Sequence, residues 1–199
     1  MTEKTDELKA LLARAEAGNS DAQFALGLAY DNAEGTPRDP VAAANWYRFA
    51  AEQNHPQAQF HLGLMLDEGD VGFQQDIEEG ARWIRKAAEQ GLMDAQFNLG
   101  LMHYNGDGVQ QDDGEAFFWF SKAVEQNHAK AQFNLGVLYA NGHGVEKNLP
   151  AAYKLWLMAV IQGDANAHAN LGMLREKLSD AEANEAQSAA VEWANRSTD

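Results

Sequence analysis

Apolar residues recur along this chain at the spacing of helices, in runs separated by polar and glycine-rich segments. In the first such run Ala22, Leu26 and Tyr30 are four residues apart, which places them on one face of a helix. A second run follows, in which Trp46 and Ala50 have the same spacing. Alanine, leucine and aromatic residues dominate both runs and β-branched residues are sparse. The pattern therefore predicts pairs of amphipathic helices.

The same pair of runs is written several times, and a Leu-Gly dipeptide marks each copy. Its glycines are spaced by 36, 37, 36 and 36 residues: Gly27, Gly63, Gly100, Gly136 and Gly172. A fixed period in this range is typical of a solenoid, in which each unit packs on its neighbours. A glycine inside a helix costs about 1 kcal/mol relative to alanine. Its recurrence predicts that the second helix of each pair crosses the first at this point. The second helix has its own repeated position, at Trp46, Trp83 and Trp119.

These observations predict an all-α fold, a right-handed α-solenoid of antiparallel helix pairs with about 11 helices. We expect one domain over residues 1–199. It would contain an N-terminal capping helix at 5–18 that starts at Thr5 or Asp6, repeats at 21–55, 56–92, 93–128 and 129–164, and a degenerate C-terminal capping repeat at 165–196.

A connector rich in glycine joins the two helices of each repeat, as in NGDGV (105–109) and NGHGV (141–145). Glycine permits the positive φ angles of tight turns. Each connector ends in a residue that can cap the next helix: Asp39, Asp76, Asp112 and Asn148. The second helices are expected to end on left-handed residues at Asn54, Gly91, Asn127 and Gly163.

Composition narrows the range of partners. The chain carries 30 acidic against 15 basic residues, a formal net charge of −15, spread over its length. Nucleic acid and anionic membranes are therefore poor partners, and a protein or peptide with a basic surface is favoured. The alternative is that the charge serves solubility alone. There is no cysteine, no apolar run of signal-peptide length and no segment of the roughly 20 apolar residues that cross a membrane. We expect a cytoplasmic protein, with a monomer favoured.

The repeated motif A-Q-F-x-L-G-x-x-Y-x-x-G-x-G-V-x-x-D, followed by A-x-x-W and K-A-A-E-Q-G, resembles the Sel1-like repeat family. These repeats are related to tetratricopeptide repeats but are longer. The resemblance covers about residues 21–163 strongly. It implies a scaffold, adaptor or regulator that acts through contacts with proteins. Bacterial members of the family occur in signalling, in envelope processes and as partners that neutralise toxins.

Catalytic and metal-binding chemistry gain little support from the sequence. The six histidines do not form HExxH or another spacing typical of metal ligands, and two of them, His55 and His128, share one position at the end of a repeat. No GxSxG nucleophile motif is present, and the connector glycines recur as turns instead of forming a phosphate loop. We expect no enzyme, no cofactor and no metal. A β-lactamase-like hydrolase, as once proposed for some relatives, is a remote alternative.

Binding candidates come from acidic connectors and from helix positions that differ between copies. The segments 67–79 and 105–121 contain acids but no base, and stacking of the repeats would align them along one edge. Acids at a helix start also favour the helix dipole, which accounts for some of them. Repeated phenylalanines and leucines on the first helices either line a concave binding face or pack between helices. The candidate binding residues are Asp31, His61, Asp67, Asp70, His103, Tyr104, Asp107, Asp112 and Asp113.

The sequence thus predicts a non-enzymatic interaction module that binds a partner protein or peptide through the concave face of the first helices and the acidic connector edge. The alternative is an immunity or antitoxin-like protein that neutralises a basic toxin.

Overall fold

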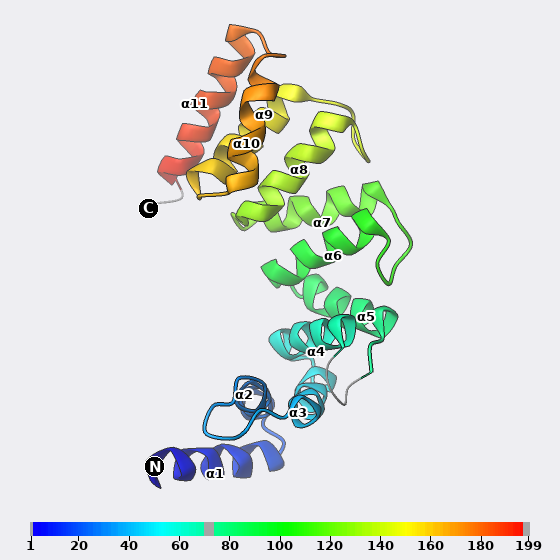
Figure 1. Cartoon of the computed structure of the whole chain (residues 1–199), viewed down its shortest axis with the longest axis vertical. Coiled ribbons are helices and arrows are strands. Elements are labelled where there is room, and N and C mark those ends of the chain that lie inside the picture. The colour runs from blue at the N-terminus through cyan, green and yellow to red at the C-terminus, as the bar shows by residue number, and fades with distance from the viewer. Residues whose placement is uncertain (1, 70–73, 197–199) are drawn as a thin grey trace. The chain divides into compact units, whose positions relative to one another are not determined.

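The computed structural model describes residues 2–69 and 74–196, and within these ranges the chain forms eleven helices and no strand (Figure 1). The predicted all-helical class is confirmed. The helices are α1 Thr2–Glu16, α2 Ser20–Asp31, α3 Pro40–Glu52, α4 Pro56–Glu68, α5 Ile77–Glu89, α6 Met93–Asn105, α7 Asp113–Glu125, α8 Ala129–Asn141, α9 Leu149–Ile161, α10 Ala165–Arg175 and α11 Asp180–Arg196. We call α2, α4, α6, α8 and α10 A helices, and α3, α5, α7 and α9 B helices.

The helices belong to two compact units. The first contains residues 1–95 and 107–109, and the second contains residues 96–106 and 110–199. Each unit is described by itself below. A single continuous solenoid domain therefore stays a prediction.

Side-chain caps set the starts of the helices. Asp39, Asp76, Asp112 and Asn148 cap the B helices as predicted, each accepting a backbone N–H from the first turn. The A helices use caps that the sequence analysis did not identify, at Asn19, His55, His128 and Asp164. One expectation was wrong: α1 begins at Thr2, before Thr5 and Asp6, since neither glycine nor proline interrupts the segment 2–6.

Left-handed residues end the B helices. The φ angles at Asn54 and Asn127 are 63° and 66°, and those at Gly91 and Gly163 are both 89°. All four predicted stops are confirmed. Asparagine and glycine occur there because they adopt the left-handed conformation most readily. In the first connector Ala33 takes a φ of 59° at the position where the other repeats have glycine. An alanine there carries backbone strain that glycine would not.

Close helix crossings explain four of the five repeated glycines. A Cβ on Gly27 would lie 2.5 Å from the ring of Tyr47, and one on Gly100 would lie 2.6 Å from the ring of Phe120. Ile84 covers Gly63 and Trp156 covers Gly136 in the same way. The predicted crossing of α2, α4, α6 and α8 by their B helices is confirmed. In each repeat the residue that covers the glycine directly follows the position that tryptophan occupies in the first three repeats.

The tryptophans themselves lie beside the crossing. The indole N–H groups of Trp83 and Trp119 donate to Glu79 and Glu115, one turn earlier in the same helix, at 3.1 Å. Trp46 packs edge-on against Phe49. Gly172 is the exception among the glycines, because a Cβ there would meet no atom within 4 Å. The predicted crossing is wrong at this position, since α11 packs on α9 instead.

A ladder of buried glutamines joins successive helices. Gln59 is fully buried: its amide nitrogen donates to the carbonyl oxygen of Ala51 in α3, and its amide oxygen accepts from Gln90 after α5. The same side-chain pair occurs in the other repeats, as Gln53 with Gln23, Gln126 with Gln96 and Gln162 with Gln132. Each pair therefore ties the start of an A helix to the end of its own B helix.

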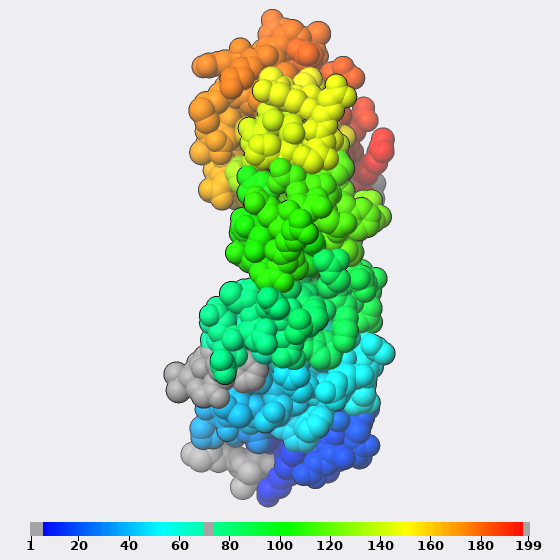
Figure 2. All heavy atoms as spheres, turned by 90° about the vertical axis from the view of Figure 1, so that its right-hand side faces the viewer, coloured from blue at the N-terminus to red at the C-terminus, as the bar shows by residue number. Residues whose placement is uncertain are grey.

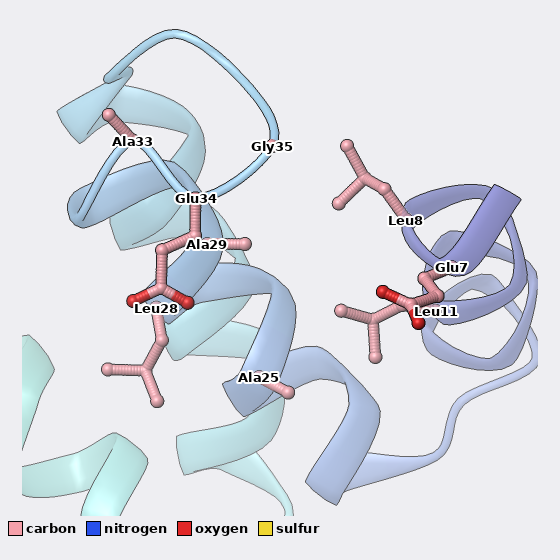
Figure 3. A pocket seen from close by; sticks show the side chains of 9 residues that line it. All are labelled: Glu7, Leu8, Leu11, Ala25, Leu28, Ala29, Ala33, Glu34 and Gly35. Carbon is pink, nitrogen blue, oxygen red and sulfur yellow. The ribbon is translucent and has the colours of Figure 1, made fainter. Parts of the chain in front are cut away.

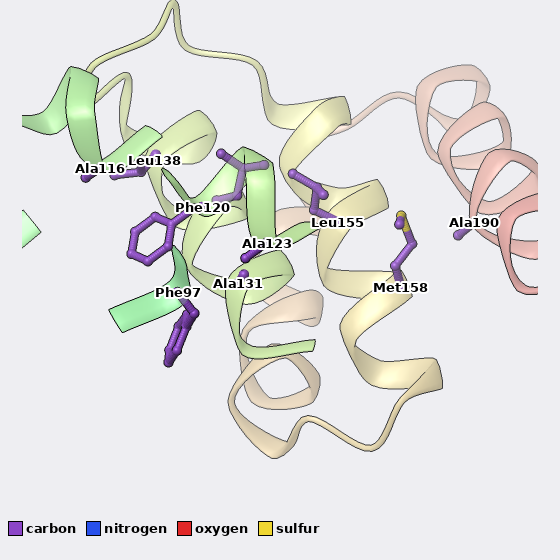
Figure 4. Packing of buried hydrophobic residues seen from close by; sticks show 10 residues of the cluster. Phe97, Ala116, Phe120, Ala123, Ala131, Leu138, Leu155, Met158 and Ala190 are labelled. Atoms are coloured by element: carbon purple, nitrogen blue, oxygen red, sulfur yellow. The ribbon is translucent and has the colours of Figure 1, made fainter. Parts of the chain in front are cut away.

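Alanines and larger apolar residues alternate in the cores. In the second unit Phe97, Phe120, Leu138, Leu155 and Met158 pack with several alanines, and Ala190 of α11 closes the cluster (Figure 4). Small residues allow the helices to approach closely, and the large ones fill the space between them. The cores thus fix the A helices and place their connectors at the surface.

Candidate functional site

A small pocket in the first unit contains two of the predicted binding residues. Asp31 at the end of α2 and His61 in α4 both line it, together with Arg38, Glu68 and other residues, around a volume of about 170 Å³. The guanidinium of Arg38 holds the end of α2: its Nε donates to the Asp31 carbonyl oxygen at 3.2 Å, and its Nη2 lies 3.6 Å from the Asp31 carboxylate. The pocket is large enough for one side chain of a partner.

His61 forms part of the pocket wall. Its ring packs against the rings of Phe24 and Tyr47, at centroid distances of 5.4 and 5.3 Å. Burial lowers the pKa of His61, and the carboxylate of Asp31 opposes that shift. The hydroxyl of Tyr47 lies 3.4 Å from Asp31, and burial together with that carboxylate raises the pKa of the phenol. The neutral imidazole is therefore the form that suits this packing.

The connectors pack on the starts of the preceding B helices. In the first unit a Cβ on Gly108 would lie 2.5 Å from the carbonyl oxygen of Ile77, at the start of α5. In the second unit a Cβ on Gly144 would meet the carbonyl of Asp113, at the start of α7. The connector after α8 lies on the surface that faces the viewer in Figure 2, coloured yellow. In the first unit the same connector brings Asp107 near Asp67 of the preceding repeat.

Asp67, in α4, lies near the carboxylates of Glu68 and Asp107. Burial raises its pKa, and the nearby carboxylates of Asp107 and Glu68 raise it further. Asp107 lies in the next connector and is exposed. Gln75 donates to the backbone oxygen of Asp67 at 2.7 Å and so fixes this end of α4. The structure thus brings Asp67 and Asp107 near each other, as the stacking of acidic connectors predicts.

The other acidic candidates have structural partners or lie elsewhere. The carboxylate of Asp112 caps α7 by accepting from the backbone N–H groups of Gly114 and Glu115, at 2.8 and 3.0 Å. Asp113 follows it and is half-buried. Asp70 lies outside the described residues.

His103 is placed inside the protein. Its side chain is buried, with 6% exposure, and its Nδ1 lies 3.2 Å from the carbonyl oxygen of Gln110. This burial contradicts the selection of His103 as a surface residue for a partner. The neighbouring Tyr104 is half-buried, and its carbonyl accepts from the side chain of Gln111 at 2.9 Å. Both residues therefore hold the connector in place.

The remaining repeated side chains are structural. His55 and His128 accept the backbone N–H of the third residue of their helices, and their rings pack on those of Phe24 and Phe97. Phe133 stacks on Trp156 in the same way. Of the two interpretations of the phenylalanine row, packing between helices is the one that these contacts support. In the described part of the chain, no group of three or more histidine or acidic side chains could hold a metal ion.

The repeat architecture now identifies the family. A family model for the Sel1 repeat matches residues 20–55, 56–92, 94–128, 129–164 and 165–199. The chain belongs to the Sel1 repeat family. Proteins with Sel1 repeats generally mediate interactions between proteins. Within the described ranges, no helix combines the length and the apolar character that crossing a membrane requires.

Solved Sel1 structures share this fold. A Sel1 repeat protein from Oxalobacter formigenes is 32% identical with a TM-score of 0.76, over 85% of this chain and 72% of that one. A protective antigen of uropathogenic Escherichia coli strains is 27% identical with a TM-score of 0.60, over 92% of this chain and 47% of the antigen.

Among curated proteins, HRD3B of Arabidopsis thaliana, an ERAD-associated E3 ubiquitin-protein ligase component, is 42% identical over 69 residues. That segment is 34% of this chain and 11% of the relative. The chain thus spans about a tenth of this relative's length.

Proposed function

We propose that this Sel1 repeat protein is a non-enzymatic interaction module whose acidic connectors and A-helix ends bind a protein or peptide with a basic surface. The observation that carries the proposal is the crowding of like charges at Asp67. The carboxylates of Asp107 and Glu68 add to the effect of burial in raising the pKa of Asp67, and a cation of a partner would offset this repulsion. Binding of a basic segment there would therefore gain both new ion pairs and relief of repulsion.

The pocket beside Asp31 supplies a second contact in the same unit. Its lining combines the carboxylates of Asp31 and Glu68 and the guanidinium of Arg38 with the apolar side chains of Leu64 and Met65. Because carboxylates outnumber cations there, apolar and acidic groups together suit the stem and the charged head of a lysine or arginine side chain. A basic peptide could place one side chain in this pocket while its backbone continues past Asp67.

Charge reversal tests the proposal. The chain is immobilised and used to capture proteins from its native lysate at low and high salt, as wild type, as Asp67→Lys/Asp107→Lys and as a matched control. The control is Glu52→Lys/Glu89→Lys, which makes the same change in net charge at exposed positions on α3 and α5. We expect a basic protein that is held at low salt, released at high salt and lost only with the connector variant.

Equal capture by both variants would remove the acidic connectors from the binding surface. A partner that is retained at high salt would contradict the electrostatic mechanism.

The narrower form of the proposal is neutralisation of a basic toxin, which the net charge of −15 favours. It predicts that co-expression of this chain rescues cells from a toxic protein encoded nearby, and that the connector variant fails to rescue. Rescue that survives the connector variant would separate neutralisation from these acids.

A further inference from the structure

The last A helix, α10, lacks the B helix that covers its counterparts. At Gly27, Gly63, Gly100 and Gly136 an added Cβ would clash with a side chain of the repeat's own B helix, but at Gly172 it would meet nothing within 4 Å. The next residue, Met173, is a large apolar side chain that is 60% exposed. The face that a B helix covers on the other A helices is thus exposed on α10.

The short link after α10 explains this. Only residues 176–179 join α10 to α11, whereas residues 32–39 join α2 to α3. With so short a link α11 cannot cross back over the glycine, and it packs on α9 instead. Ala190 lies in the core with Met158, and the indole of Trp193 donates to Asn127 at 2.9 Å. These contacts hold α11 away from Gly172.

Helix α1 offers the complementary surface. The segment AEAGNSDAQ (15–23) matches AEQNHPQAQ (51–59), so α1 stands in the register of a B helix. Leu11 occupies the position of Tyr47, which covers the glycine in the first repeat, and Leu8 occupies that of Ala44. Tyr47 and Ala44 are buried, whereas both leucines are half-buried. Leu8 and Leu11 pack against the core that α1 shares with α2, but they leave part of the surface of α1 uncovered.

A groove marks the uncovered surface of α1. It has a volume of about 620 Å³ and lies between α1 and α2, where Leu8 and Leu11 point across it toward α2 (Figure 3). Ala25, Leu28 and Ala29 form the opposite wall. The groove is therefore apolar and of a size to admit side chains from another helix.

We propose that α10 of one copy docks on α1 of a second copy, with Gly172 beneath Leu11 and Met173 in the groove beside Leu8. This contact would continue, between chains, the packing of an A helix on a B helix that each repeat already uses. Glu7 and Glu34 line the groove, and Glu176 and Lys177 follow α10, so Lys177 of the docked copy can pair with one of these carboxylates. Because the two surfaces differ, the association is head-to-tail and extends into short chains of molecules.

The net charge of −15 opposes any association of copies, so screening by salt should strengthen this contact. Salt should weaken binding of a basic partner at the acidic connectors. The two proposals use different surfaces and have opposite salt dependences, and either can fail without the other.

Sedimentation equilibrium over a series of protein concentrations tests the contact. The wild type should show an average mass above the 21.9 kDa of one chain that rises with concentration and with salt. Met173→Glu should remain at the mass of one chain. The matched control is Val191→Glu, an apolar residue of α11 with a similar exposure of 55%, which should associate like the wild type.

Gly172→Ala supplies a variant that cannot be dismissed as misfolded. Its Cβ enters open space in the single chain, yet it should weaken association because it would meet Leu11 of the second copy. Retained association of Gly172→Ala and Met173→Glu, or a wild type that keeps the mass of one chain at every concentration, would overturn the proposal.

Mixing two variants tests the head-to-tail geometry. Met173→Glu blocks the α10 surface and Leu8→Glu blocks the groove, so each should keep the mass of one chain when alone. The mixture should form a pair at twice the mass of one chain and no larger species, because one intact surface remains on each variant. A mixture that contains single chains only would contradict the pairing of these two surfaces.

Discussion

The contrast between Gly100 and Gly172 tests the crossing of A and B helices quantitatively. At Gly100 an added Cβ would lie 2.6 and 2.7 Å from two ring carbons of Phe120, whose side chain is fully buried. Carbon atoms in contact prefer about 3.5–4.0 Å, so the helices would have to separate by about 1 Å. Because the ring is enclosed, we take the upper end of the overpacking cost, about 3 kcal/mol.

Alanine regains about 1 kcal/mol of helix propensity relative to glycine. Gly100→Ala should therefore lower the free energy of unfolding by about 2 kcal/mol. Gly172→Ala has no steric cost in the single chain and should raise it by up to about 1 kcal/mol. Each variant adds the same methyl group, and the two glycines occupy equivalent positions of the repeat.

Urea unfolding followed by far-UV circular dichroism, at a protein concentration low enough to avoid association, measures both changes. The wild type and both variants are compared at one pH and salt concentration. If Gly100→Ala is as stable as the wild type, or Gly172→Ala is the less stable of the two, the explanation of the repeated glycines is refuted.

Three further predictions concern polar groups that are buried or half-buried. His61→Asn should make the free energy of unfolding less sensitive to acid. The folded-state pKa of His61 lies below its usual 6.5, so the stability that the neutral imidazole contributes is complete above that pH and is lost as the pH falls. Melting temperatures of the wild type and the variant at pH 7.5 and pH 5 measure the difference. Asp67→Asn should raise the free energy of unfolding at pH 7 by no more than about 0.5 kcal/mol. The pKa of Asp67 is raised because the fold disfavours its charged form, and solvent screens this effect. An unfolding curve that shows a loss of stability would contradict the prediction. Gln59→Leu removes hydrogen bonds of both the amide nitrogen and the amide oxygen and should lower the free energy of unfolding by about 2–3 kcal/mol. Gln132→Leu should lower it by less, because the Gln132 amide nitrogen has no hydrogen-bond partner. Equal losses for the two variants in chemical denaturation would contradict a stabilising role of the glutamine ladder.

Local signals in the sequence were sufficient for both ends of the B helices. Glycine and asparagine at the ends of the B helices carry a backbone requirement that any sequence reveals, and the same holds for caps such as Asp39. The histidine caps of α4 and α8 were less obvious. Their shared position indicated a structural role, but acceptance of an N–H by the imidazole is visible only in three dimensions.

Contacts between repeats were harder to predict. The glutamines of the repeated Ala-Gln and Glu-Gln dipeptides were a signal that could have suggested the ladder, because polar residues recur at fixed positions for a reason. The residue that covers each glycine differs in kind, from Tyr47 to Ile84, so only its neighbour, tryptophan, stood out. The course of α11 depends on tertiary packing on α9, which no local pattern encodes.

For the candidate site, sequence variation was an incomplete guide. It identified Asp31 and His61, which the fold brings into one pocket, but it also identified His103, which fills the interior. A residue that differs between copies can serve packing as well as recognition, and burial decides between them. Arg38 was not identified, because its role depends on the end of α2 that it holds.

The most direct test of the proposed function is the salt dependence of affinity for the captured partner. The dissociation constant is measured by calorimetric titration over a range of salt concentrations for the wild type, the connector variant and the Glu52→Lys/Glu89→Lys control. We expect a steep loss of affinity with salt for the wild type and the control, and weaker binding with a flatter dependence for Asp67→Lys/Asp107→Lys. Affinity and slope that are the same for all three proteins would contradict binding through the acidic connectors.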